Sequence, residues 1–166
     1  TITPFTSLIQ TGTTVAAKVI AGDRHAFYID NNNYLYAWGL NNAGQLGQND
    51  TVARSSPVQI GTDTYVDVKA GLSFTLALET DNSLFIWGYN NVGQLGDTTS
   101  INRSSPVVVN SGLSFTSISA GYDHALGITS TGLMYGWGNN QNNIVDQTNI
   151  YNQEWTTYPG LIGTTL

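Results

Sequence analysis

Short apolar segments alternate with turn residues along the whole chain, and no window has helical spacing. His25–Ile29 is rich in aromatic and aliphatic residues, and a second apolar segment, Tyr34–Trp38, follows the polar turn Asp30–Asn33. Asn, Asp and Gly tolerate the positive φ that tight hairpin turns require. The pattern therefore predicts an all-β fold of short antiparallel strands.

Several of these segments are apolar on nearly every residue, as in Leu84–Trp87 and Leu133–Trp137. A strand that is apolar on both sides is buried on both faces. We therefore expect sheets that stack face to face around an axis, because a single sheet with a solvated side would alternate apolar and polar residues.

Four sequence markers recur in register about 50 residues apart. An Ala-Gly pair ends the first strand of each unit and a Trp-Gly pair ends the third. A Gly-Gln-Leu-Gly segment and an Arg-Ser-Ser-Pro segment follow in the first two units. The marker residues of the first three kinds are Gly22, Gly71 and Gly121, then Trp38, Gly39, Trp87, Gly88, Trp137 and Gly138, then Gly44, Gln45, Gly47, Gly93, Gln94 and Gly96. Such a period is the signature of a repeat architecture.

Each unit predicts four strands, the first around Val19–Ala21 in unit one and the fourth beginning near Pro57, Pro106 and, more loosely, Pro159. Proline can open a strand or lie on an edge, so we place it at the start of the strand. The predicted organisation is an N-terminal segment with an outer strand of its own (1–16), repeat 1 (17–60), repeat 2 (61–109) and repeat 3 (110–166).

The pattern Ala-Gly-x-x-His, a turn, Leu-Tyr-x-Trp-Gly-x-Asn, Gly-Gln-Leu-Gly and Pro resembles the regulator of chromosome condensation repeat from about residue 15 to 163. The resemblance implies a β-propeller of four-stranded blades, usually about seven to a closed ring. Units one and two match closely. Unit three keeps His124 and Trp137 but has Asn143-Ile144-Val145-Asp146 where Gly-Gln-Leu-Gly would stand, so its loop is expected to differ.

Three blades form an arc or part of a ring and leave two flanks without a neighbour. Leaving one blade face wet forgoes about 8 kcal/mol, and two such faces rival the largest apolar patches on soluble monomers. Pro4–Gln10 precedes Ala21 much as Pro57–Ile60 precedes Ala70, which predicts an outer strand of a blade whose other strands lie elsewhere. We therefore expect self-association, other subunits that complete the ring, or a longer polypeptide, and no stable monomer.

Composition removes several classes of function. The chain has five Lys and Arg against eleven Asp and Glu, with a net charge of -6, whereas a nucleic-acid site needs clustered basic residues. It has no Cys, and no apolar stretch approaches the length of a membrane span, so we expect no membrane insertion. The polar, Asn- and Thr-rich, Lys-poor composition favours an extracellular or virion-surface location.

No set of residues predicts catalysis. We find no Ser-His-Asp arrangement, paired carboxylates or Cys nucleophile, and therefore expect no enzyme, no cofactor and no metal site. His25 and His124 occupy the same place in units one and three, where unit two has Phe74. An aromatic replacement indicates a packed position rather than a ligand.

The candidate protein-binding residues are Asp23, Arg24, Tyr122 and Asp123. They lie in loops that, by the resemblance, face the propeller axis, and loops on a rigid scaffold commonly carry binding. We expect a non-enzymatic structural or protein-recognition module. The alternatives are an inhibitor or receptor-binding domain that uses these ring-mouth loops and, less favoured by the acidic balance, a guanine nucleotide exchange factor.

Overall fold

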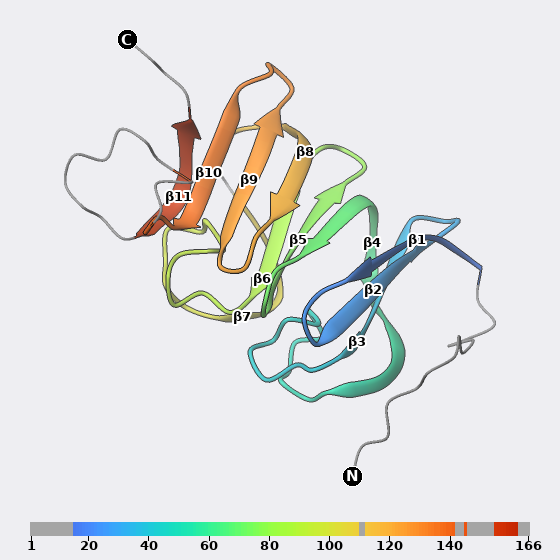
Figure 1. The fold of residues 1–166 in the computed structure, drawn as a ribbon. Helices are drawn as coiled ribbons and strands as arrows, with labels where there is room; N and C mark the ends of the chain where they lie inside the picture. Colours follow the sequence, from blue (N-terminus) through green and yellow to red (C-terminus); the bar gives the residue numbers. More distant parts are fainter. Residues whose placement is uncertain (1–14, 110–111, 142–144, 146–154, 163–166) are drawn as a thin grey trace, which may run out of the picture.

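A computed structural model describes residues 15–109, 112–141, 145 and 155–162. The described residues form eleven β-strands and no helix, so they contain no helix that could cross a membrane. The strands are β1 (Ala16–Ala21), β2 (His25–Asp30), β3 (Tyr34–Gly39), β4 (Arg54–Ala70), β5 (Phe74–Glu79), β6 (Leu84–Gly88), β7 (Arg103–Val108), β8 (Phe115–Ala120), β9 (His124–Thr129), β10 (Met134–Asn139) and β11 (Trp155–Ile162). The all-β prediction is confirmed (Figure 1).

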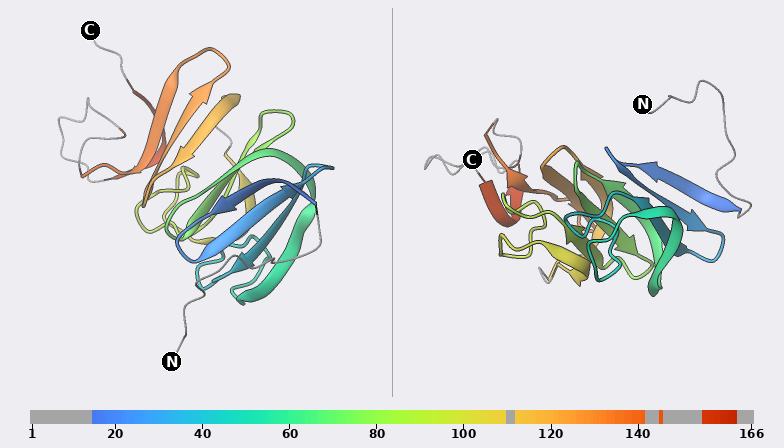
Figure 2. Two further views of the ribbon diagram at one scale, coloured as in Figure 1. Left: turned by 45° about the vertical axis from the view of Figure 1, so that its right-hand side comes forward. Right: turned by 90° about the horizontal axis from the view of Figure 1, so that it is seen from below.

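The strands make three antiparallel blades of four strands, as predicted. The long strand β4 belongs to two of them: it pairs with β3 as far as Thr64 and with β5 from Tyr65 onward. The first blade is therefore β1, β2, β3 and the first part of β4, and the second is the rest of β4 with β5, β6 and β7. The third blade has the order β11-β10-β9-β8. Figure 2 shows the three sheets side by side in chain order, from blue to orange.

The first hairpin turn has the chemistry that its sequence predicts. The Asp30 carboxylate accepts hydrogen bonds from the backbone N–H groups of Asn32 (2.8 Å) and Tyr34 (2.9 Å). Asn33 has a φ of 67°, a conformation that Asn tolerates better than most residues. The turn therefore sets the register that pairs Ile29 with Leu35.

The fourth strands begin three residues before the predicted prolines, so their expected starts near Pro57 and Pro106 were wrong. Ala37 pairs with Val58, whereas Gly39, two residues further along β3, pairs with Arg54. The extra residues on β4, Pro57 among them, form a bulge opposite Trp38. The same shift recurs between β6 and β7 and between β10 and β11, where it contains Pro106 and Pro159. A bulge is a place where a strand accepts proline, because no ladder hydrogen bond is lost there.

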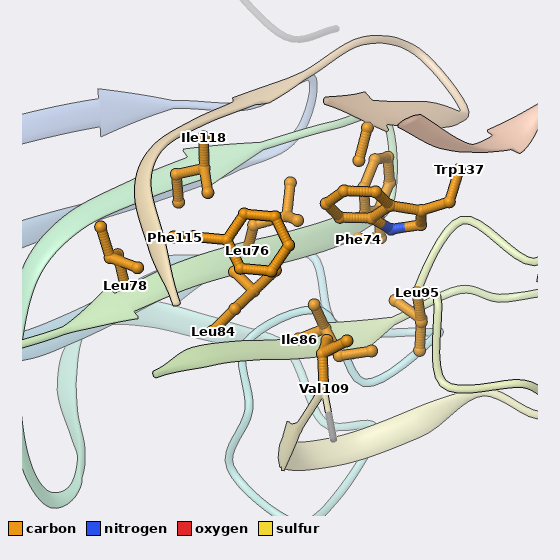
Figure 3. Close-up of a cluster of buried hydrophobic side chains, with 11 residues drawn as sticks. Phe74, Leu76, Leu78, Leu84, Ile86, Leu95, Val109, Phe115, Ile118 and Trp137 are labelled. Carbon is orange, nitrogen blue, oxygen red and sulfur yellow. The ribbon is translucent and has the colours of Figure 1, made fainter. Parts of the chain in front are cut away.

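The hydrophobic core consists of two clusters, one in each space between neighbouring blades. Between the first and second blades, Phe27, Ile29 and Leu35 pack against Trp87 and Ala77. Figure 3 shows the cluster between the second and third blades, whose buried residues are Phe74, Leu76, Leu78, Leu84, Ile86, Leu95, Val109, Phe115, Ile118, Ala125 and Trp137. The second blade is thus buried on both faces, as the apolar segment Leu84–Trp87 predicted.

Candidate protein-interaction surfaces

Neighbouring blades are joined by a tryptophan of one blade that enters the Gly-Gln-Leu-Gly loop of the blade before it. The Trp87 indole N–H of the second blade donates a 2.8 Å hydrogen bond to the backbone carbonyl of Gln45 in the first. The Trp137 N–H of the third blade donates a 3.1 Å bond to the carbonyl of Gln94 in the second. Both tryptophans have no exposed surface. Each joint therefore combines burial of a large aromatic side chain with a satisfied polar group.

The glycines that close these loops make room for the indole. Gly47 and Gly96 have φ values of 69° and 66°, and a Cβ added there would lie 3.0 Å from Trp87 and 2.8 Å from Trp137. A Cβ at Gly44 would lie 2.5 Å from the Cα of Ser104 in the next blade. The glycines thus serve blade-to-blade contact as well as a tight backbone path.

An asparagine before each loop fixes its shape. The Asn41 side chain accepts a hydrogen bond from the N–H of Leu46 (2.9 Å), and Asn90 does the same for Leu95 (3.0 Å). In the third unit the side-chain oxygen of Asn140 accepts a hydrogen bond from the N–H of Val145 (3.0 Å), and Val145 is fully buried. Val145 therefore takes the place of the two leucines, although the rest of the predicted loop, residues 143, 144 and 146, lies outside the described residues.

The side of the first blade that faces away from the second carries an aromatic row. Because side chains alternate across a strand, Tyr28, Tyr36 and Trp38 lie opposite the residues packed on the second blade. The rings of Tyr28 and Tyr36 stack at 4.5 Å with an interplanar angle of 10°, and Trp38 lies 6.2 Å from Tyr28. We call the surface made by these three residues and Val19 the leading face.

Equivalent positions in the three blades differ sharply in exposure. Val19 is 77% exposed, whereas Val68 and Ile118, at the same place in the second and third blades, are 0% and 3% exposed. Trp38 is half-buried, and its indole N–H has no hydrogen-bond partner within the described part of the chain. The leading face thus exposes Val19 and part of Tyr36 and Trp38 at positions that are blade interfaces in the other blades, whereas Tyr28 is 8% exposed.

The outer side of the third blade is also open. Ile128 and Met134 are 42% and 40% exposed, whereas Leu78 and Leu84 at the corresponding places in the second blade are 3% and 1% exposed. We call the surface of Leu126, Ile128 and Met134 the trailing face. The two flanks expected from three repeats are therefore both present and apolar.

The predicted loop residues fall into two separate pairs. Asp23 and Arg24 lie between β1 and β2 and form an exposed ion pair of 3.3 Å. Tyr122, between β8 and β9, is 67% exposed, and its carbonyl accepts a hydrogen bond from the N–H of Leu72 in the second blade. Within the described residues, no hydrogen bond or ion pair joins one pair to the other.

Asp123 has a bracing role within the third blade. Its carboxylate accepts a 2.8 Å hydrogen bond from the Asn139 side chain, and its carbonyl accepts from the Asn139 N–H. The exposed members of the predicted set are therefore Asp23, Arg24 and Tyr122, whereas Asp123 holds the loop to the end of β10.

His25 occupies a packed position beside Gly22. It is 4% exposed, neither ring nitrogen has a hydrogen-bond partner, and the ring meets Phe27 edge-on at 5.4 Å. Burial, which disfavours the charged imidazolium, lowers the pKa of His25 from 6.5 to about 4 against the opposing effect of the Asp23 carboxylate. The described residues hold no cluster of three or more His, Cys, Asp or Glu suited to a metal ion.

The sequence predicted an open flank here but did not identify the residues of the leading face, although a signal for them was present. Tyr28, Tyr36 and Trp38 occupy alternate positions on two paired strands, where the second blade has Ala77, Phe85 and Trp87. Because the matching positions of the second blade form its interface with the first, this alignment could have identified Tyr28, Tyr36 and Trp38 as interface residues.

Comparisons with known proteins agree with this geometry. Residues 16–45, 65–94 and 115–144 match the Regulator of chromosome condensation (RCC1) repeat, and a second description of that repeat matches residues 32–78 and 81–128. A stretch of 41 residues is 46% identical to the probable E3 ubiquitin-protein ligase HERC3 of Homo sapiens, which is 25% of this chain and 4% of HERC3.

Two solved structures show the same fold. Prp20p from Saccharomyces cerevisiae matches with a TM-score of 0.78 and 24% identity over 90% of this chain, and human WBSCR16 matches with a TM-score of 0.75 and 20% identity over 89%. The chain spans 39% of each of them and 4% of HERC3. Because the repeat matches cover more than half of its residues and its blades have the expected four strands, the chain belongs to the regulator of chromosome condensation repeat family.

Proposed function

We propose that this chain is a non-enzymatic protein-interaction module that contributes three blades to a larger propeller assembly. The observation that carries the proposal is the exposure of Val19 at 77%, at a place where Val68 and Ile118 are buried. Apolar surface of this kind is stabilised by contact with another protein surface. The neighbour is a further subunit, a second copy of the chain, or further blades of a longer polypeptide.

Analytical ultracentrifugation of the pure 166-residue chain tests this proposal. We expect concentration-dependent association at micromolar concentration, together with binding of a hydrophobic dye, because two apolar faces are open. A cooperatively folded monomer at the same concentration, without dye binding, would refute the proposal, since its open faces would then need no partner.

A recognition role of the ring-mouth loops is the second candidate, favoured by the 67% exposure of Tyr122. In this role the module is an inhibitor or a receptor-binding domain that presses these loops against a partner. Alanine changes at Asp23, Arg24 and Tyr122 should abolish capture of such a partner while circular dichroism and the unfolding midpoint stay unchanged. Asp123→Ala is unsuitable for this test, because it also removes the hydrogen bond from Asn139.

Nucleotide exchange is a third possibility that one assay separates from the others. Prp20p has been studied for its binding to Gsp1p and histones, but this chain spans 39% of it and has a net charge of -6. We expect the chain to leave the release of labelled GDP from Gsp1p unchanged, with Prp20p as the positive control. The proposed location, outside the cell or on a virion surface, rests on composition alone.

A further inference from the structure

A cavity of 320 Å³ lies between the first and second blades, lined by the loop before β4, by β4 itself and by residues of β6 and β7. We propose that this cavity, which we call the first-joint cavity, binds an alkylammonium group. Its volume falls in the range of small-ligand sites. The inference goes beyond the proposed function, because the cavity lies at an internal joint and is present whatever covers the open flanks.

The first polar group of the cavity is the phenol of Tyr65. Tyr65 has 0% exposed surface, lines the cavity and meets Phe85 edge-on at 6.2 Å. Its hydroxyl has no hydrogen-bond partner within the described residues. Because buried polar groups are almost always hydrogen-bonded, an unpartnered hydroxyl on a residue that lines a cavity points to a ligand that supplies the partner.

The second polar group is the carboxylate of Asp63, which lines the same cavity two residues before Tyr65. Asp63 forms no ion pair within the described residues, and neither does Glu79, which lies opposite Tyr65 in the pairing of β4 with β5. Burial raises the pKa of the Tyr65 phenol, and the negative charges of Asp63 and Glu79 add to this rise. Two carboxylates therefore act on this phenol without a cation to balance them.

The chain has no cation of its own to place in the first-joint cavity. All five Lys and Arg residues form ion pairs with aspartates that do not line it, namely Asp23, Asp50, Asp67 and Asp97. A ligand therefore has to bring the positive charge.

The chemistry of the lining favours an organic cation over a metal ion. Along the described ranges there is no group of three or more His, Cys, Asp or Glu that could hold a metal ion. An ammonium group instead needs a carboxylate and a few hydrogen-bond acceptors, which Asp63 and the Tyr65 oxygen provide. The rings of Tyr65 and Phe85 offer contact to the carbon chain of an amine, and aromatic rings also attract cations.

A second cavity, of 620 Å³, lies at the joint between the second and third blades and serves as an internal comparison. Phe115 occupies there the place of Tyr65. The N–H of each residue donates to the carbonyl of an asparagine in the preceding blade, Asn82 for Phe115 and Asn33 for Tyr65. The second joint therefore has a ring without a hydroxyl at this position.

The acidic group is also replaced at the second joint. Leu113 lines the second cavity two residues before Phe115, where the first-joint cavity has Asp63. The one acidic residue among its described lining residues, Asp97, is already paired with Arg103 at 2.7 Å. The unbalanced acid and the unpartnered phenol thus occur together at the first joint and not at the second.

Ligand-observed NMR with the full 166-residue chain tests the inference. Saturation-transfer signals of n-butylamine, titrated at neutral pH where the amine is protonated, give a dissociation constant, and 1-butanol is the neutral control of the same length. We expect the amine to bind with a dissociation constant on the order of millimolar and 1-butanol at least about fivefold more weakly. The method does not require a monomer, so its result is independent of association through the open faces.

Three variants locate the binding. Asp63→Asn removes the charge at an exposed position and should weaken butylamine binding about fivefold. Tyr65→Phe, which copies Phe115 of the third blade, removes only the hydroxyl and should weaken it about threefold. Asp81→Asn is the matched control: it removes one charge from a carboxylate that holds the Ser83 turn and is not among the lining residues, so binding should change less than about twofold.

A lysine peptide identifies the source of the ammonium group. The probes are the tripeptide Ac-Gly-Lys-Gly-amide and its Nε-acetylated form, which lacks the charge and should bind as weakly as 1-butanol. Tighter binding of the lysine peptide than of butylamine would assign the cavity to a lysine side chain of a partner protein. Equal binding would assign it to a small free amine.

Two results would overturn the inference: a native chain that binds butylamine no better than 1-butanol, or a folded Asp63→Asn variant that binds butylamine as tightly as the native chain. Circular dichroism and urea unfolding establish that each variant is folded. Neither result bears on the proposed function, which fails only if the native chain is a folded monomer without exposed apolar surface.

Discussion

The first and second blades are built from nearly the same repeat, yet they differ in what covers them. Trp87 of the second blade is fully buried and bonded to the carbonyl of Gln45, whereas Trp38 of the first is half-buried without a described acceptor. Because the two blades have the same residues at matched positions, Trp at 38 and 87 and Val at 19 and 68, the comparison shows that these side chains owe much of their burial to the blade before them. Stability in such arrays is approximately a sum of repeat terms and nearest-neighbour interface terms.

Arrays of repeats usually end in units with a polar outer face. The first blade has instead Tyr28, Tyr36 and Trp38 on its outer side, and the third has Ile128 and Met134. The first and third blades therefore lack the polar outer face of a capping unit, and the outer faces of both resemble the buried faces of an interior blade.

The largest expected effect is that of Trp87→Ala. Removing this side chain leaves a cavity and removes one of the two hydrogen bonds that the Gln45 carbonyl accepts, the other coming from the Thr75 hydroxyl, so the free energy of unfolding should fall by about 3–5 kcal/mol. Trp38→Ala is the matched variant in the first blade and should cost less than about 1.5 kcal/mol in the isolated chain, because its side chain is already half in water. Urea unfolding followed by circular dichroism measures both, and equal losses would contradict the comparison.

Gly96→Ala should be the next most destabilising change. The new Cβ would lie 2.8 Å from the Trp137 indole, in a backbone conformation with a φ of 66°, and we expect a loss of about 2–4 kcal/mol. Gly132→Ala is the control, since Gly132 has a φ of 82° but nothing within 4 Å of an added Cβ. This control should lose about 1 kcal/mol of stability, the cost of the backbone conformation alone. The difference between the two losses is the cost of the contact between the new Cβ and Trp137.

His25 should make the stability of the first blade depend on pH. The folded state holds the pKa of His25 at about 4, below its ordinary value of 6.5, so the unfolded state binds the proton first as the pH falls. Stability should therefore decrease between about pH 6.5 and pH 4, by at most about 3 kcal/mol. Thermal unfolding at a series of pH values measures this slope.

His25→Phe, which copies Phe74 of the second blade, should remove that slope. His124→Phe is the control, because His124 is only half-buried, and it should leave the slope in place. If the stability of the His25→Phe variant still falls between pH 6.5 and pH 4, the pH dependence comes from other groups.

The smallest effects are expected at the aspartates that brace the loops. Burial acts to raise the pKa of Asp97, but hydrogen bonds from Thr99 and Arg103 outweigh it and lower that pKa. Asp97→Asn should cost about 1 kcal/mol above pH 4 and less in more acidic solution, where the carboxylate is protonated in any case. Asp50→Asn in the first blade should cost less, since the Asp50 side chain is 36% exposed against 5% for Asp97. Calorimetric melting temperatures at pH 7 decide the order.

Much of the fold follows from spacing alone. The spacing of the repeat markers predicted four-stranded blades, and the apolar segment Leu84–Trp87 predicted a sheet buried on both faces; both predictions are confirmed. These features depend on local pattern, which the repeat displays more than once. The pairing of each tryptophan with the preceding loop was not predicted, because that contact joins residues about 40 positions apart.

Other features depend on contacts that no local pattern contains. Val19 and Val68 are the same residue in the same motif, and only the presence of a neighbouring blade separates 77% from 0% exposure. Pro57 lies in a bulge rather than at a strand start because the register with β3 shifts there. Asp123 was predicted to be a free loop residue, but its place as a brace depends on Asn139 across the hairpin.

The continuity of β4 has a consequence for how such chains gain and lose repeats. A break between the first and second blades would cut a strand that is hydrogen-bonded on both sides of Thr64 and Tyr65, whereas a break at the Asn31–Asn33 turn would cut only a tip. Duplication or recombination at turns therefore yields segments that each hold half of one blade and half of the next. Each inserted segment therefore shares a sheet with the blade on either side of it. An array can lengthen in this way without a step at which a new blade is connected by a loop alone.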